Sequence, residues 1–132
     1  MVTGITHVGV LVSDLERSLN FYLGVPVIEE AFRLRKEDGT LMLVYLKVAH
    51  QQFVELFPGG SGGKQDNSVY FHVCLQTDDI HGLHQELLSR GFSPRNRPER
   101  HDDDHTWQFW IDDPDGNAIE FQQFTAESRQ LN

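Results

Sequence analysis

The sequence predicts an α+β fold of two βαβββ modules, whose curved mixed sheets form an open metal-binding cup. Three observations support this. The predicted order of strands and helix in residues 1–58 recurs in residues 69–132, and matching residues in the two halves stand at a constant offset of 65. A chain of 132 residues with 39% hydrophobic content also has the size of one folded domain. We therefore expect residues 1–132 to form a single domain.

The first module, residues 1–58, is expected to open with a strand over residues 5–12, where β-branched side chains alternate. Ser13, with Glu16 three positions on, has the pattern of a capping box and predicts a helix that ends at Gly24. Three further strands are expected, over residues 27–35, 41–48 and 52–57.

A Gly-rich segment, residues 59–68, is predicted to link the modules. The second module then repeats the order, with a strand over 69–76 and a helix over 79–90. The polar neighbours of His81 and His84 place both histidines on an exposed helix face. The remaining strands are expected over residues 92–97, 106–111 and 118–124.

Two histidines and two glutamates recur with the module. His7 precedes Glu55 by 48 residues, and His72 precedes Glu120 by the same 48. In each of the four strands the His or Glu lies on the face opposite to the apolar side chains. We therefore expect helices to cover the apolar face of each sheet and these four side chains to face the cup. This mixed nitrogen and oxygen set suits one divalent ion, either Ni, Zn, Co, Mn or Fe, and leaves two octahedral positions for substrate.

An open metal site of this kind indicates catalysis. A metal that holds two adjacent substrate oxygens polarises a carbonyl and stabilises an enediolate, and a carboxylate that leaves the metal becomes a general base. Residues that share the strand face of these four side chains, or that have aromatic rings, are candidates for a substrate pocket. Aromatic residues in a strand are, however, more often core residues. The pocket candidates are Leu11, Phe53, Phe57, Tyr70, Cys74, Trp107, Phe109 and Gln122.

The composition excludes several classes of partner. With 20 acidic against 11 basic residues and a net charge of −9, the chain is a poor partner for nucleic acid or an anionic membrane. No apolar run is long enough to span a bilayer, and a single cysteine allows neither an internal disulfide nor a Cys-based zinc cluster. We expect a cytoplasmic protein that acts on a small molecule.

Several segments resemble the vicinal oxygen chelate superfamily, which includes glyoxalase I, methylmalonyl-CoA epimerase, extradiol dioxygenases, fosfomycin-resistance proteins and bleomycin-binding proteins. The resemblance covers nearly all of the chain. The segments are Ile5-Thr6-His7-Val8-Gly9-Val10, Ser18-Leu19-Asn20-Phe21-Tyr22, Val54-Glu55-Leu56, Phe71-His72-Val73 and Asp112-Asp113-Pro114-Asp115-Gly116-Asn117 before Ile119-Glu120-Phe121.

This resemblance implies a metal set most like that of glyoxalase I, because Glu55 stands where the bacterial enzyme has a glutamate. It favours Glu120 as the mobile base and Glu55 as the second candidate. Leu11 and Gly59 replace an arginine and an asparagine of bacterial glyoxalase I, so glutathione recognition is not expected. The resemblance also implies a homodimer whose metal sites are shared between subunits, and the intrachain arrangement stays open.

The predicted activity is that of a glyoxalase-like lyase or an isomerase/epimerase, which promotes proton transfer next to the carbonyl of a small metabolite. Three alternatives stay open. An iron(II) extradiol-type dioxygenase would use only His7, His72 and Glu120. The others are a thiol-transfer resistance enzyme and a non-catalytic small-molecule-binding protein of the same superfamily.

Overall fold

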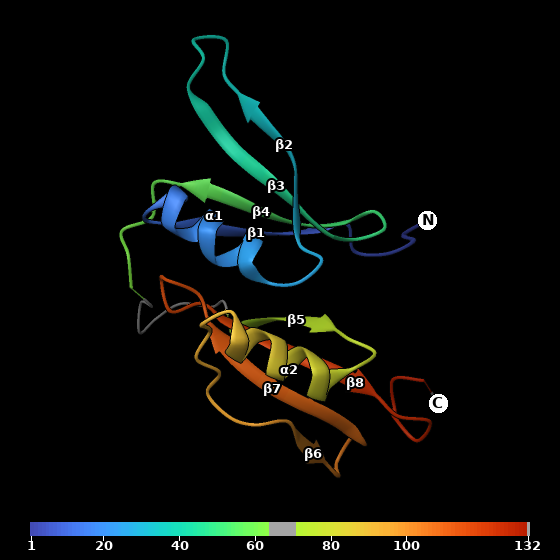
Figure 1. The fold of residues 1–132 in the computed structure, drawn as a ribbon. Helices are drawn as coiled ribbons and strands as arrows, with labels where there is room; N and C mark the ends of the chain where they lie inside the picture. The colour runs from blue at the N-terminus through green and yellow to red at the C-terminus, as the bar shows by residue number, and fades with distance from the viewer. Residues whose placement is uncertain (64–70, 132) are drawn as a thin grey trace. The chain divides into compact units, whose positions relative to one another are not determined.

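The computed structural model describes residues 1–63 and 71–131, and the chain divides into two compact units, residues 1–63 and 64–132. Each unit contains a four-stranded mixed sheet and one helix (Figure 1). The predicted α+β fold of two βαβββ modules is thereby confirmed.

In the first unit the strands lie in the order β1-β4-β3-β2. The first and last strands, β1 and β4, pair in parallel, whereas the other neighbours are antiparallel. The helix α1 packs against β4. The elements are β1 (His7–Val12), α1 (Leu15–Gly24), β2 (Glu29–Arg35), β3 (Leu41–Ala49) and β4 (Gln52–Pro58).

The second unit repeats this topology with the order β5-β8-β7-β6. Again the first and last strands of the unit pair in parallel, and the helix α2 packs on β7 and β8. The elements are β5 (His72–Gln76), α2 (Ile80–Ser89), β6 (Glu99–His101), β7 (Thr106–Asp112) and β8 (Ala118–Phe124).

Both helices begin at an aspartate. The Asp14 carboxylate accepts a hydrogen bond from the backbone N–H of Arg17 at 3.1 Å, and Asp79 accepts one from Gly82 at 2.9 Å. The predicted cap at Ser13 was therefore one residue early. An ionised carboxylate here also interacts favourably with the positive end of the helix dipole.

The strand predicted over residues 92–97 does not form, and the edge strand β6 starts only at Glu99. Pro94 and Pro98 flank the irregular stretch, and neither has the backbone N–H that a regular ladder requires. One ladder-like bond remains, from the N–H of Arg95 to the carbonyl of Trp110 at 2.8 Å.

Each unit has an apolar core between its helix and one face of its sheet. In the first unit Val12, Tyr22 and Leu56 are fully buried, and in the second Ile80 and Leu87 of α2 are. His84, predicted to be exposed, is buried instead. Its ring meets the edge of Phe109 at 5.1 Å between ring centroids, because a helix that lies on a sheet buries one whole side of its surface.

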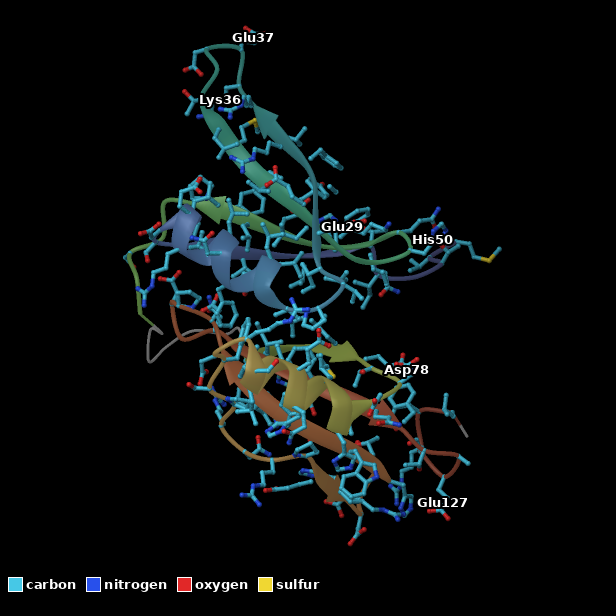
Figure 2. All side chains as sticks on the ribbon, viewed as in Figure 1. Glu29, Lys36, Glu37, His50, Asp78 and Glu127 are labelled. Carbon is cyan, nitrogen blue, oxygen red and sulfur yellow. The ribbon has the colours of Figure 1, made fainter. Side chains whose placement is uncertain are left out.

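Polar and charged side chains lie at the turns that join the strands. Lys36 and Glu37 occupy the β2–β3 turn, and His50 lies in the β3–β4 turn (Figure 2). Over residues 1–63 and 71–131, none of the helices is both long and apolar enough to cross a membrane.

The turn before β8 is held by a buried carboxylate. Asp113 accepts hydrogen bonds from the backbone N–H groups of Asp115 at 2.9 Å and Asn117 at 2.8 Å, and from the Asn117 side chain at 3.0 Å. Three bonds to one buried anion fix the point where β8 begins.

Replacing this carboxylate should destabilise the protein. We expect Asp113→Ala to lower the free energy of unfolding by about 2–4 kcal/mol, because it leaves buried N–H groups without an acceptor. Urea unfolding followed by circular dichroism measures the change. The exposed Asp102, replaced by alanine, serves as control and should change stability by less than about 0.5 kcal/mol. Equal stability of both variants would contradict the role given to Asp113.

Candidate metal centre

In the first unit the histidine and glutamate of the repeat lie together. His7 on β1 and Glu55 on the adjacent β4 bring Nε2 and Oε2 to 3.5 Å of each other. Gly9 is the direct cross-strand partner of Glu55, and a Cβ atom there would stand 3.2 Å from the Phe57 ring. The glycine thus leaves room for the Phe57 ring next to Glu55.

The second unit forms the same pair. His72 on β5 and Glu120 on β8 place Nε2 and Oε2 at 3.2 Å. Cys74 takes the position of Gly9 as the cross-strand partner of the glutamate. Desolvation and the negative charge of Glu120 raise the pKa of the Cys74 thiol to about 12. In the absence of a bound ion, Cys74 is therefore a protonated thiol at neutral pH.

Both glutamates are largely buried. Each carboxylate side chain is 7% exposed, whereas the side chains of His7 and His72 are 44% and 29% exposed. Burial of an ionised carboxylate is costly unless it is paired with a cation or hydrogen-bonded. In each pair the glutamate carboxylate is thus buried, and the histidine ring is more accessible to solvent.

An aromatic ring flanks each pair from the third strand of its unit. Tyr45 lies opposite Glu55, and its ring is 6.2 Å from that of His7. A hydrogen bond to Glu55, then burial and the carboxylate charge, raise the pKa of Tyr45. Trp110 lies opposite Glu120, with its ring 4.8 Å from that of His72. The repeat therefore places a phenol beside one carboxylate and an indole beside the other.

The spacing within each pair fits two neighbouring ligands of one ion. With ligand distances of roughly 2.1 Å, the two donor atoms lie roughly 3.0 Å apart at a right angle and roughly 3.4 Å apart at a tetrahedral angle. The observed 3.2 Å lies within this range, and the observed 3.5 Å lies just above it. The donor types, imidazole nitrogen and carboxylate oxygen, also suit a divalent metal.

The other ring nitrogen of a ligating histidine normally donates a hydrogen bond, which orients the ring. Nδ1 of His7 lies 3.1 Å from the hydroxyl of Thr6. Nδ1 of His72 is buried and has no hydrogen-bond partner among residues 1–63 and 71–131. In the same residues no three His, Cys, Asp or Glu side chains gather around one point. Each unit by itself thus supplies one two-ligand pair.

Five of the predicted pocket residues share a strand face with these pairs. On β1 and β4 the parity of Leu11, Phe53 and Phe57 is that of His7 and Glu55, and in the second unit Cys74 and Gln122 share the parity of His72 and Glu120. Tyr70 lies outside the described residues.

Trp107 and Phe109 lie on the opposite face of β7, so the structure does not support their assignment to the pocket. Phe109 is fully buried and stacks on Phe121 at 5.0 Å, and Trp107 contacts the ring of His81 on α2 at 5.0 Å. The alternation of β7 instead turns Trp110 to the side of Glu120.

Tyr45 and Trp110 are not among the pocket residues predicted from the sequence. Both occupy the middle of a strand rich in hydrophobic residues, where alternation alone does not reveal which face is covered. Their separation is 65 residues, the offset that relates the two histidines and the two glutamates. Applying the repeat to every position, and not only to polar ones, would have found them.

Comparison with known proteins places the chain among relatives of matching length. The family described as "Glyoxalase/Bleomycin resistance protein/Dioxygenase superfamily" matches residues 4–121. The uncharacterized protein YwbC of Bacillus subtilis (strain 168) is 27% identical over 132 residues, which cover 93% of this chain and 99% of that protein.

A probable lactoylglutathione lyase of Synechocystis sp. (strain ATCC 27184 / PCC 6803 / Kazusa) is 25% identical over 125 residues, covering 92% of this chain and 95% of that protein. A solved member of the glyoxalase/bleomycin resistance protein/dioxygenase superfamily from Sphaerobacter thermophilus DSM 20745 has a similar fold. Its TM-score is 0.74 at 24% identity, and the match covers 93% of this chain and 98% of that one.

The placement of Phe109 can be tested through stability. Phe109→Ala should lower the free energy of unfolding by about 3–5 kcal/mol, because it empties a fully buried site in the core of the second unit. Leu11, which is 59% exposed, is the control, and its replacement by alanine should cost less than about 0.5 kcal/mol. Thermal and urea unfolding measure both. If Phe109→Ala were no more destabilising than Leu11→Ala, Phe109 would not be a core residue.

Proposed function

The chain belongs to the glyoxalase/bleomycin resistance protein/dioxygenase superfamily, and from this premise we propose that it is a metal-dependent, glyoxalase-like lyase or isomerase/epimerase. It would move a proton next to the carbonyl of a small metabolite. The observation that carries this proposal is the pair of matching His–Glu contacts, one in each unit. Members of the superfamily are often enzymes, and the Synechocystis relative is a probable lactoylglutathione lyase.

We propose that His7, Glu55, His72 and Glu120 together hold one divalent ion. A two-ligand pair with the right spacing is half of such a site, and the second unit offers the other half with the same donor types. A divalent ion bound there would polarise the substrate carbonyl and stabilise negative charge that develops beside it. The identity of the ion, Ni, Zn, Co, Mn or Fe, is left to measurement.

Glu120 is the proposed general base. The Tyr45 phenol lies opposite Glu55 and donates a hydrogen bond to its carboxylate, so one acceptor position of Glu55 is already occupied. The matching position beside Glu120 holds Trp110, and its other neighbour, Cys74, offers only a weak S–H donor. Because no phenol donates to Glu120 from the matching position, we assign to Glu120 the removal of a proton from a C–H next to the carbonyl.

The four-ligand set favours this activity over ring-cleaving oxygenation. A dioxygenase that used only His7, His72 and Glu120 would leave Glu55 without a role, yet Glu55 is buried and in contact with His7. This contact repeats the contact of Glu120 with His72, with the same donor atoms. The contact between His7 and Glu55 thus supports a site that uses both.

Substituting the proposed base should abolish turnover while the protein still binds the metal. In Glu120→Gln the amide oxygen can still bind an ion but cannot accept the proton, so we expect activity to fall by roughly 100-fold or more. Exchange of the substrate C–H in D₂O, followed by NMR with α-hydroxyketones and hemithioacetals, reports activity, and elemental analysis reports metal content. His50→Ala, in the β3–β4 turn (Figure 2), is the control for both. Full activity of a metal-loaded Glu120→Gln protein would rule out Glu120 as the base.

A site shared between subunits can be tested by mixing two inactive variants. We propose a homodimer in which His7 and Glu55 of one chain meet His72 and Glu120 of the other. His7→Ala and His72→Ala should each lose metal, but a mixed dimer would contain one intact site. Unfolding and refolding a 1:1 mixture should then restore roughly a quarter of the wild-type metal content. A site within one chain would give no recovery.

A further inference from the structure

The second unit contains a cavity of about 300 Å³ next to its His–Glu pair. It is lined by Phe71, Arg95, Asn96, Trp110 and Ala118. Its volume is at the lower end of the range for small-molecule pockets, roughly 300–1,000 Å³. The cavity therefore has room for one small group of a ligand.

Two of the lining residues connect the cavity to the proposed reaction site. Ala118 is the cross-strand partner of His72, and Trp110 is the partner of Glu120. The Trp110 ring also contacts His72 at 4.8 Å between ring centroids. A group in this cavity would thus belong to a molecule whose other end can reach the His72–Glu120 pair.

The internal repeat shows why the cavity exists in this unit. Phe53 pairs with His7 in the first unit as Ala118 pairs with His72 in the second. The Phe53 ring packs against Tyr45 at 5.6 Å, with the planes at 76°. With only a methyl group at the corresponding position, the space beside Trp110 is left open.

The walls of the cavity combine flat apolar surface with hydrogen-bond donors. Phe71 and Trp110 present rings whose centroids are 6.5 Å apart, and the Arg95 guanidinium lies 5.9 Å from the centre of the Trp110 ring. Arg95 is held by two hydrogen bonds to Asp112, one of them from Nε at 2.7 Å. Asn96 accepts a hydrogen bond from the backbone N–H of Trp110 at 3.0 Å.

These contacts fix Arg95 and still leave donors for a ligand. A guanidinium has five N–H bonds, and Asp112 occupies only two of them. The Asp112 carboxylate also balances the positive charge, so the pair can meet either a neutral carbonyl or a carboxylate oxygen. A planar group against Trp110 would bring such an oxygen toward Arg95.

We propose that this cavity is the specificity pocket of the protein, and that it selects metabolites with a planar, apolar side group that ends in a carbonyl or carboxylate oxygen. The ring or double-bond plane lies on Trp110, the oxygen accepts from Arg95, and the reacting end faces His72 and Glu120. This inference rests on the proposed function only for the reacting end, since the binding of the side group does not require turnover.

Direct binding tests the pocket without any reaction. Benzamide and benzoate serve as probes with a neutral and an anionic oxygen, and acetamide and acetate lack the ring. Ligand-detected NMR titration of the as-purified protein should show both aromatic probes binding at least about tenfold more tightly than their acetyl counterparts. Ala118→Phe, which introduces the ring found at Phe53, should abolish this preference while metal content stays unchanged.

Arg95→Met tests the oxygen contact and covers the case in which Ala118→Phe fails to fold. This substitution should lower the affinity for both benzamide and benzoate by roughly fivefold or more, because each probe loses charge-assisted hydrogen bonds. Arg33→Met is the matched control, since Arg33 forms the same two-bond pair with Glu30 but belongs to the first unit and does not line the cavity. It should leave binding unchanged.

Two results would contradict the proposed specificity pocket. One is a wild-type protein that does not prefer the aromatic probes, and the other is wild-type affinity for these probes in the folded Ala118→Phe and Arg95→Met variants. A protein that binds the probes but contains no metal would instead overturn the proposed function and leave the pocket intact. Stronger binding of benzamide than of benzoate would identify a neutral carbonyl as the group at Arg95, and the reverse would identify a carboxylate.

Discussion

The parallel pairing of the first and last strand of each module is the constraint on which the candidate site depends. It brings His7 beside Glu55, and His72 beside Glu120, although 48 residues separate the members of each pair. The antiparallel strand next to it then adds an aromatic ring on the same face. Without the crossover that sends the chain back to its first strand, the polar residues would be scattered over separate edges.

The two modules share a frame but differ in the residues that matter for chemistry. Tyr45 beside Glu55 becomes Trp110 beside Glu120, so only one of the two carboxylates receives a phenolic hydrogen bond. Phe53 becomes Ala118, which replaces a ring by open space. A duplicated site would be expected to treat both ends of a substrate alike. These differences are the reason why we propose the base and the specificity pocket in the second module.

The sequence predicted the parity of the four candidate ligands correctly, since β1, β4, β5 and β8 alternate regularly and one face of each is apolar. The predictions from the sequence were wrong where a local pattern conflicts with tertiary packing. In β7 the hydrophobic residues Trp107, Phe109 and Trp110 do not alternate cleanly, and only the register with β8 shows that Trp110 alone faces the carboxylate. His84 likewise appears polar in sequence but is buried against Phe109.

The amino-acid sequence by itself determined the repeat, the βαβββ order and the shared strand face of each His–Glu pair, because periodicity and offset are properties of the chain. Only the tertiary structure decided which atoms meet. The 3.5 Å and 3.2 Å contacts, the Tyr45 hydrogen bond and the cavity at Ala118 arise from strand register and from side chains that approach from different strands. A one-residue change in register would reverse each face while leaving every sequence pattern intact.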